Sequence, residues 1–574
     1  LASSATVTVS GLTTSGTSDA VFLAAVTTAT ANVGAGATVL GGLNGILLQS
    51  RTGSTVNNEG MINSSASGFA IQANGAAATV NNRGRINGRI DLTDAGDRVN
   101  NSGVFAAAGS SLFGAGTDLF DNSGTVLVPG AATFTGLETF NNSGLLDLRD
   151  GTVGSRLNLG GATFGGSGGS RLAIDVNFAT GTSDLITLGR AEGSTAVIVT
   201  PVGGQAVLTP GIRFAQAGAG SSATAFTTAN QGEFGLVRLE VAFNAADNSF
   251  SLVGTPSGAA LRTTSLAEAT RSLWHKSAEA WTAEMRASRD LAPDAAGEGQ
   301  EGGVRLWLQP YGAAHSRGGT GSFRLSGQDR TASLAYDQDY FGGQFGLDFG
   351  GGGPAGGLRF GLTGGYLDSH VDFDPATDRL RMKALNAGAY ASIASGPFFA
   401  NLLAKYDRVD IDARSAGAAF ELDGDSYGGM LEIGFRADAG GFFIEPTASI
   451  AYVDSDLDGF ELFGTRLSFD VDESLRGKLG ARFGSGFPVR GGARGLLYLG
   501  GNYVHEFRAE DRVSLTGGGS AVDLDAGEAE DFGEAFVGIS VGGTGPVSGF
   551  IEGFGKKGDE VEGGGGRAGL RIRF

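Results

Sequence analysis

The sequence lacks cysteine, and its first half also lacks four other residue types. None of the 574 residues is Cys and only 12 are Pro, so neither disulfides nor thiolate metal sites can hold this fold. Trp, Tyr, His and Lys are all absent before Trp274. A first half without His or Cys cannot by itself supply Ser-His-Asp or Cys-His chemistry. The change in composition predicts a domain boundary close to residue 260.

Clustered cations and long apolar runs are missing as well. The formal net charge is −19, which argues against a nucleic-acid partner because phosphate binding needs grouped Lys and Arg. The sequence has no run of about 18 or more apolar residues, the length that a transmembrane helix needs, whereas a transmembrane β-barrel would leave no such run. No charged segment followed by an apolar one comes after Leu1, so we expect a processed or truncated N-terminus.

Glycine is abundant, with 101 residues, and recurs with asparagine in a repeat. Copies of a Val/Phe-Asn/Asp-Asn-x-Gly unit begin at Val56, Val80, Val99, Phe120 and Phe140, roughly 20 residues apart, a period typical of a solenoid whose coils share one core. The second Asn of each unit is expected at a rung corner, bonding the backbone and stacking on its neighbours. These residues are Asn58, Asn82, Asn101, Asn122 and Asn142.

The repeat fades after about residue 160 into longer alternating runs, such as residues 171–176 and 235–241. Such runs are expected to be the terminal, capping rungs of the solenoid. The sequence therefore predicts solenoid repeats over residues 1–159 and a cap over residues 160–260.

Residues 266–290 have the composition of a helix. Ser265 and Glu268 form a capping-box pattern, and no Gly or Pro follows up to residue 290. Twenty-five helical residues extend about 37 Å, the height of a membrane pore. A Pro/Gly/acidic linker is expected at 292–303, so that helix and linker occupy 261–302. The predicted apolar side of the helix consists of Leu266, Leu273, Trp274, Trp281 and Met285.

Residues 303–574 alternate apolar and polar side chains with a period of two, as outer-membrane strands do. The gaps between segments alternate long and short, which a membrane barrel with short turns and long external loops requires; an antiparallel sandwich is the soluble alternative. The twelve predicted strands are 304–314, 337–350, 356–371, 380–395, 397–411, 425–438, 440–454, 473–487, 493–508, 531–543, 546–556 and 564–574.

The alternation assigns side chains to the two faces of this barrel. Phe341, Phe345 and Phe349 would face lipid, and Gln344 and Asp348 the interior. A helix about 10 Å wide is a plausible plug for twelve strands, and packing of lumenal cations against Glu279 or Glu284 is favoured over an open, anion-attracting pore. The predicted lumenal cations are Arg476, Lys478, Arg482, Arg571 and Arg573.

Three motif matches indicate little chemistry. Residues 165–169 match G-x-S-x-G, but without the strand-elbow-helix context that a nucleophile needs. Residues 424–427 resemble the Gly-Asp-Ser block of lipolytic esterases, yet open a predicted strand. Residues 454–459 match half of a calcium loop in an expected external loop, but its twelfth position is Thr465 rather than Glu. Nothing pairs His275, His315, His370 and His505 in the sequence. We predict no catalytic residue, no metal and no cofactor.

Taken in order, these features resemble a monomeric (type Va) autotransporter. The resemblance rests on the Asn-Asn-Ser-Gly repeats, the segment 183–189, the helix at 272–276, the twelve strands and the C-terminal Arg571-Ile572-Arg573-Phe574. It implies an all-β fold: a right-handed parallel β-helix passenger, a pore-spanning α-helix and a 12-stranded antiparallel transmembrane β-barrel. It also implies that Phe574 is part of the signal read by the barrel assembly machinery, and that residues 160–260 form an autochaperone-like region.

The function implied by the resemblance is translocation, anchoring and display of the passenger on a Gram-negative cell surface. Some family members cut themselves at an Asn in the pore helix; residues 266–290 contain no Asn, so an uncleaved, adhesive or structural, non-enzymatic passenger is predicted. Expected partners are outer-membrane lipid or lipopolysaccharide for the barrel, and host, glycan, neighbouring-cell or self contacts for the passenger. The alternative function is an outer-membrane channel or porin-like barrel with an accessory N-terminal domain.

Overall fold

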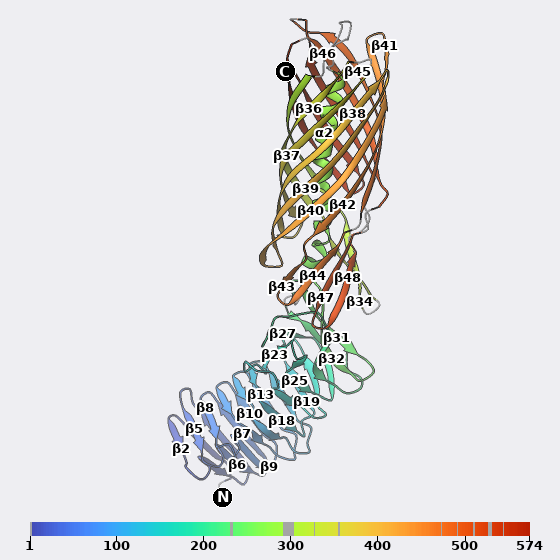
Figure 1. The fold of residues 1–574 in the computed structure, drawn as a ribbon. Helices are drawn as coiled ribbons and strands as arrows, with labels where there is room; N and C mark the ends of the chain where they lie inside the picture. The colour runs from blue at the N-terminus through green and yellow to red at the C-terminus, as the bar shows by residue number, and fades with distance from the viewer. Residues whose placement is uncertain are drawn as a thin grey trace. The chain divides into compact units, whose positions relative to one another are not determined.

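The computed structural model describes residues 3–229, 233–290, 303–325, 328–353, 356–471, 473–490, 492–508, 511–525, 531–543 and 545–574. The linker predicted after the helix lies outside these residues, up to residue 302. The chain forms two compact units (Figure 1). The first comprises Leu1–Thr255 with Gly517–Ser520, and the second Pro256–Thr516 with Ala521–Phe574.

The first unit is a β-solenoid whose strands form three sheets, so the predicted solenoid is confirmed. One sheet contains β1 (Ala5–Val9), β4 (Thr28–Val33), β7 (Gly53–Asn58), β10 (Ala78–Asn82), β13 (Arg98–Asn101), β16 (Leu119–Asn122), β19 (Thr139–Asn142), β22 (Thr163–Gly166) and β26 (Arg190–Gly193). The next contains β2 (Leu12–Thr14), β5 (Thr38–Gly41), β8 (Met61–Ser64), β11 (Arg85–Asn87), β14 (Val104–Ala106), β17 (Thr125–Leu127), β20 (Leu145–Asp147), β23 (Arg171–Asn177), β27 (Thr195–Pro201) and β29 (Phe226–Thr228), with β24 (Thr182–Ser183) on β23.

The third sheet of the solenoid ends differently from the other two. It contains β3 (Val21–Ala24), β6 (Ile46–Ser50), β9 (Ile71–Gly75), β12 (Ile90–Asp91), β15 (Gly109–Leu112), β18 (Ala131–Thr135), β21 (Arg156–Asn158), β25 (Leu185–Thr187), β28 (Thr209–Gln216), β32 (Ser249–Pro256), β31 (Val237–Asn244) and β30 (Glu233–Phe234). Pairing is parallel up to β28, and β32 then pairs β28 antiparallel. The parallel rungs therefore end in an antiparallel layer, which covers an otherwise open sheet edge.

The Asn-Asn repeats stack in register along the first sheet. Asn58 Nδ2 donates to Asn82 Oδ1, Asn82 to Asn101 and Asn101 to Asn122, each at 2.7 Å, and Asn122 donates likewise to Asn142. All five side chains are buried. The ladder satisfies polar groups that would otherwise be buried without partners. Beside it, the phenylalanine rings of successive rungs stack in the core, with 5.0 Å between the ring centroids of Phe120 and Phe140.

A second ladder in the first unit is acidic. The backbone N–H of Asp97 donates to Asp118 Oδ1 at 2.6 Å, and that of Asp118 to Glu138 Oε2 at 2.7 Å. Burial, aided by the nearby charges of Asp97 and Glu138, raises the pKa of Asp118 to about 6. Burial also raises the pKa of Asp97. This stack therefore holds carboxyl groups that are costly to ionise.

The second unit begins with two helical segments, α1 (Gly258–Arg262) and α2 (Ser265–Asp290). The sequence predicts α2 within one residue but not α1, whose N-cap Ser257 accepts a hydrogen bond from Ala260 N at 3.2 Å. A single turn this short leaves no periodicity to detect. No helix among the described residues is long and apolar enough to be a membrane span.

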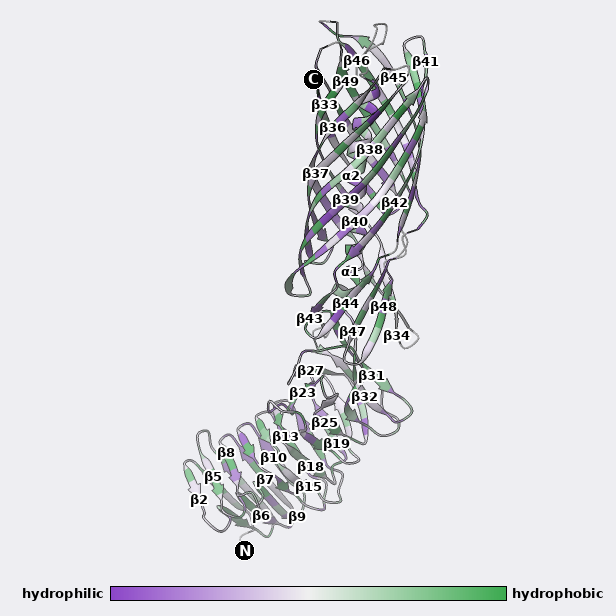
Figure 2. Ribbon diagram, viewed as in Figure 1, coloured by the Kyte–Doolittle hydropathy of each residue, from purple (hydrophilic) through white to green (hydrophobic). Residues whose placement is uncertain are grey.

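The predicted twelve-stranded antiparallel barrel is confirmed, and it closes through the pairs β33–β51 and β40–β42. Figure 2 shows hydrophilic and hydrophobic residues alternating along its strands. These strands are β33 (Gly303–Arg317), β36 (Tyr336–Gly353), β37 (Gly356–Phe373), β38 (Arg379–Ser395), β39 (Phe398–Ser415), β40 (Ala418–Phe435), β42 (Phe442–Leu457), β45 (Ser474–Pro488), β46 (Arg494–Glu506), β49 (Phe532–Gly542), β50 (Val547–Gly558) and β51 (Val561–Arg573), with the short β41 (Ala437–Ala439) on β42.

Three of the predicted long loops are strands instead. They form hairpins that join in a six-stranded sheet beyond the end of the barrel opposite the C-terminus (Figure 1). Hairpin strands supply each other's backbone partners, so the loops stay ordered away from the barrel wall. The sheet contains β35 (Gln328–Ser333), β34 (Thr320–Leu325), β48 (Ser520–Asp525), β47 (Arg512–Gly517), β44 (Thr465–Asp470) and β43 (Phe460–Leu462).

Candidate functional site: the barrel lumen

Helix α2 lies inside the barrel (Figure 1). Most of its side chains are buried, including charged ones such as Arg271, Lys276, Glu284 and Arg286. A buried charge is costly unless it is paired. The barrel wall must therefore supply partners around the helix.

One flank of α2 is apolar and packs on β33 and β36–β42. Trp274 and Trp281 are fully buried, and Trp274 Nε1 donates to Lys405 O at 3.2 Å. The ring of Trp281 lies edge-on to that of Tyr390, with 5.5 Å between centroids. Leu266 and Leu273 belong to a buried cluster, and Met285 to a second one. The structure thus places all the predicted apolar residues of the helix against one side of the wall.

The opposite flank of α2 is polar and faces β45, β46, β49, β50 and β51. Lys478 Nζ donates to Glu279 Oε1 at 3.1 Å, and Arg571 pairs with Glu284. Two of the five predicted lumenal cations therefore bind the helix at the predicted acids. Arg286 of the helix also pairs with Glu552 Oε1 on β50 at 3.0 Å.

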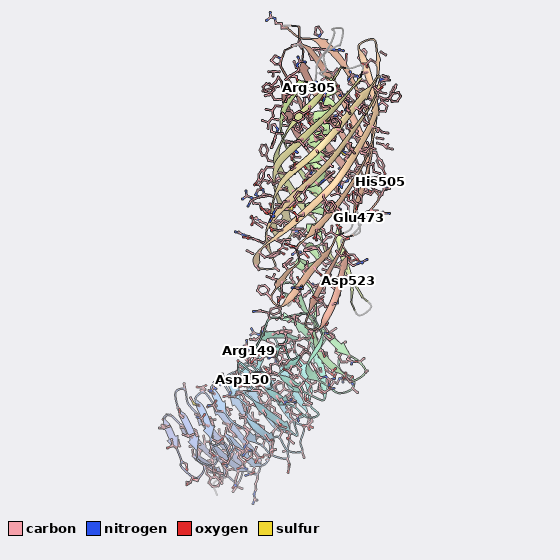
Figure 3. All side chains as sticks on the ribbon, viewed as in Figure 1. Arg149, Asp150, Arg305, Glu473, His505 and Asp523 are labelled. Atoms are coloured by element: carbon pink, nitrogen blue, oxygen red, sulfur yellow. The ribbon has the colours of Figure 1, made fainter. Side chains whose placement is uncertain are left out.

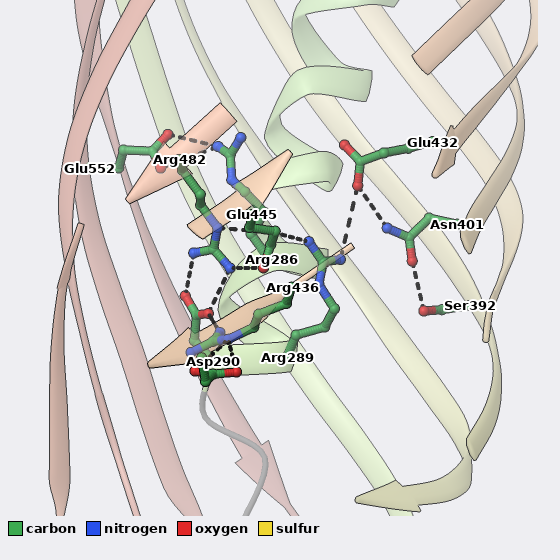
Figure 4. A network of polar contacts seen from close by, with 11 residues as sticks. Arg286, Arg289, Asp290, Ser392, Asn401, Glu432, Arg436, Glu445, Arg482 and Glu552 are labelled. Atoms are coloured by element: carbon green, nitrogen blue, oxygen red, sulfur yellow. Dashed lines mark hydrogen bonds and ion pairs between the residues drawn. The ribbon is translucent and has the colours of Figure 1, made fainter. Parts of the chain in front are cut away.

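A charged network surrounds the C-terminal end of α2 (Figure 4). Arg482 Nη1 and Nη2 donate to Asp290 at 2.7 Å, and Arg482 also pairs with Glu445 at 2.8 Å. Arg436 binds Asp290 at 2.9 Å and Arg289 binds Glu445 at 3.0 Å. Each acid here meets two guanidinium groups, so the last turn of the helix is clamped from several strands.

The outer end of the helix has its own ion pairs. Arg271 makes a bidentate pair with Asp511, at 2.8 and 2.9 Å, and both side chains are 3% exposed. Glu268 pairs with Arg317 at the end of β33, and Arg262 of α1 with Asp378. Ion pairs thus occur at both ends of the lumen.

The remaining predicted residues lie outside the helix contacts. Arg476 binds Glu506 at 2.9 Å, and Arg573 donates to Gly545 O at 3.4 Å in the β49–β50 connection. Phe574 is 76% exposed, and its backbone N–H donates to Val304 O at 3.0 Å. The sequence reasoning missed Asp511 and the helix-terminal clamp, although the charges within residues 266–290 indicated that partners were needed.

The motif matches take no part in a common site. Ser426 is buried inside β40 and bonds Ser455 Oγ at 2.8 Å, so it does not open a strand as predicted. Residues 454–457 belong to β42, so the external loop expected from residue 455 begins later than predicted: the strand runs further than its hydrophobic pattern. No group of three or more His, Asp or Glu is arranged to hold a metal in the described part of the chain.

The histidines are likewise scattered. His275 is in α2 and His315 in β33, both buried, whereas His370 is exposed. His505, on the outer surface (Figure 3), bonds Asp531 Oδ1 at 2.5 Å. They form no shared ligand set among the described residues. What the lumen does chemically is to hold a charged helix by matched ion pairs.

Residues 314–553 match the family model described as the autotransporter beta-domain. A comparison with curated proteins finds no match. Similar solved structures include the β-domain of the Bordetella autotransporter BrkA, 20% identical over 47% of this chain and 98% of that one, with a TM-score of 0.37. The transport unit of AIDA-I from Escherichia coli is 16% identical over 52% and 98%, with a TM-score of 0.38. The translocator domain of NalP from Neisseria meningitidis is 15% identical over 54% and 99%, with a TM-score of 0.39.

Proposed function

The chain is an autotransporter outer-membrane protein, because its barrel carries the autotransporter β-domain, and on this premise we propose that it anchors an uncleaved adhesive or structural passenger. The barrel lies in the Gram-negative outer membrane and the solenoid passenger outside the cell. The observation that supports permanent anchoring is the set of ion pairs along α2, from Arg271–Asp511 to Asp290–Arg482. Each buried pair adds to the cost of withdrawing the helix from the lumen.

Helix composition supports the absence of self-cleavage. Residues 265–290 contain no Asn. Passenger and barrel should therefore run together as one covalent species after purification from outer membranes. A separate barrel fragment starting within α2 would contradict this part of the proposal.

The surface of the first solenoid sheet supports an adhesive or structural role over a catalytic one. Thr30, Thr55 and Thr79 pair in register, and so do their outward neighbours Asn32, Asn57 and Asn81. The outer amides form a ladder at 2.9 Å. Such a repetitive hydrogen-bonding face needs no catalytic group to bind a partner.

The decisive experiment is protease shaving of intact cells followed by mass spectrometry. Peptides from before residue 260 should be released, and the barrel should stay in the membrane. The channel alternative predicts the reverse, with the N-terminal half protected until the outer membrane is breached. Turnover of an ester or peptide substrate by the released fragment would contradict a non-enzymatic passenger.

Membrane insertion is proposed to depend on Phe574. The terminal residue follows β51, which pairs with β33 to close the barrel. By the proposed role, removing Phe574 lowers the amount of folded barrel in the outer membrane and leaves more unfolded protein in the periplasm. Equal insertion of the native protein and of the variant without Phe574 would mean that Phe574 only contacts the lipid interface.

A further inference from the structure

Helix α2 fills the lumen unevenly. Its apolar flank packs directly on strands such as β38 and β39, whereas two cavities adjoin the face that carries Glu279. The outer cavity, of about 80 Å³, is lined by Ser272, His275 and Lys276 of α2 together with residues of β33, β36, β45, β46, β49, β50 and β51. The inner cavity, of about 50 Å³, is lined by Thr282 and Arg286 of α2 and by strand residues that include Ser449 and Asn502.

Both cavities suit water. A buried water molecule needs about 10–15 Å³ and two to four polar partners, so each cavity has room for several. Hydroxyl, amide and charged groups line both of them. Water there would solvate the lumenal charges that no direct contact satisfies.

The cavities meet at one place. Glu279, Glu534 and Phe554 line both of them. Between the two carboxylates, Lys478 Nζ donates to Glu279 Oε1 at 3.1 Å and to Glu534 Oε2 at 2.8 Å. A single ammonium group thus ties the helix to β49 where the two cavities share lining residues.

We propose that the barrel holds a hydrated side path for water and small ions along the face of α2 that carries Glu279, and that the Lys478 bridge closes it. Such a path is a property separate from display of the passenger. It rests on the proposed function in one respect, namely that α2 stays inside the barrel. Because Lys478 spans from the wall to the helix, its side chain occupies the passage. Its charge also opposes cation entry between the two carboxylates.

The test is ion conductance of the purified full-length protein in planar bilayers with potassium chloride. Lys478→Ala should raise single-channel conductance several-fold over the native protein and shift selectivity toward cations, because Glu279 and Glu534 remain. Leu403→Ala is the matched control, since it truncates a fully buried side chain of the wall that lines neither cavity. Its conductance should equal that of the native protein.

Thiol labelling gives a second readout in a chain without cysteine. A small charged thiol reagent added outside the cell should label Ser272→Cys in the outer cavity but not Ser449→Cys in the inner one. Adding Lys478→Ala should make Ser449→Cys reactive from outside.

Three outcomes would overturn the side path. They are a folded Lys478→Ala protein with unchanged conductance and labelling, an equal rise in Leu403→Ala, and external labelling of Ser449→Cys with Lys478 intact. Failure of the proposed function appears separately, as protection of the N-terminal half in protease shaving.

Discussion

Asp290, the last residue of α2, accepts hydrogen bonds at 2.7 Å from both terminal guanidinium nitrogens of Arg482 on β45. Their side chains are 0% and 2% exposed. Arg482 also meets Glu445, so one guanidinium joins the helix end to two wall strands. This geometry makes the helix part of the folded barrel rather than a segment passing through it.

Replacing Arg482 should destabilise the barrel strongly. Arg482→Leu leaves Asp290 and Glu445 short of a partner in a buried site, at a cost of about 3–5 kcal/mol. Urea unfolding in lipid vesicles, followed by tryptophan fluorescence, measures it, since all three tryptophans lie in α2 and β33. The control Arg408→Leu removes an exposed pair with Asp423 and should cost at most about 1 kcal/mol. Equal losses of stability in Arg482→Leu and Arg408→Leu would mean that the buried ion pairs of Arg482 add nothing to the stability of the barrel.

The buried and outward asparagines of one rung should differ in importance. Asn101→Ala removes partners from Asn82, Asn122 and Thr125 O, and each buried group left unpaired costs about 1–3 kcal/mol. Asn100→Ala, on the half-exposed ladder, leaves groups that water can reach and should cost less. Protease digestion of the passenger in increasing urea measures both. A larger loss of passenger stability in Asn100→Ala than in Asn101→Ala would contradict the prediction that the buried asparagine matters more.

The passenger should become more stable on mild acidification. The folded pKa of Asp118, about 6, lies above its unfolded value, roughly 3.9. Its contribution is therefore fully present below that unfolded value and is lost as the pH rises through about 6. Burial also raises the pKa values of Asp97 and Asp184, so these residues act in the same direction. The hydrogen bond from Ser249 lowers the pKa of the exposed Asp247, so this residue acts in the opposite direction.

Asp118→Asn tests this pH dependence, because it keeps an acceptor for Asp97 N–H without a titrating proton. The native passenger should gain about 1–2 kcal/mol between pH 7 and pH 5, and Asp118→Asn should lose most of that gain. The matched substitution Asp150→Asn, on the exposed surface near Arg149 (Figure 3), should retain it. If Asp118→Asn gained as much stability on acidification as the native passenger, the pH dependence would have to come from groups other than Asp118.

Outward aliphatic side chains of the barrel should not tolerate charge. Leu479 is 64% exposed on β45, and lysine at the bilayer midplane costs about 2–4 kcal/mol. Leu479→Lys should therefore lower barrel stability in vesicles by an amount in that range. Glu421→Lys, near the outer end of β40, should cost about 0–1 kcal/mol. Loss of this difference in vesicles would place Leu479 outside the lipid band.

The sequence by itself determined the architecture. The repeat in register from Val56 to Val80 defines stacked rungs, and the alternation of Phe345 with Gln344 separates lipid from lumen, because a strand's side chains point to opposite faces. Both patterns are local and periodic, so they can be read without knowing which strands pair. The helix at 265–290 was visible for the same reason.

Only the tertiary structure decided the partners and the extent of the elements. Arg271 meets Asp511 across 240 residues, and no spacing in the sequence indicates such a pair. The three external hairpins were predicted as loops because their strands are at most six residues long, well short of the roughly 10-residue alternating segments expected of outer-membrane strands. The outer end of β42 was predicted as a loop because it carries the polar residues Asp454, Ser455 and Asp456. Which flank of α2 packs on apolar side chains, and where Lys478 bridges the cavities, depends on the closed wall that brings β45 and β49 to the helix.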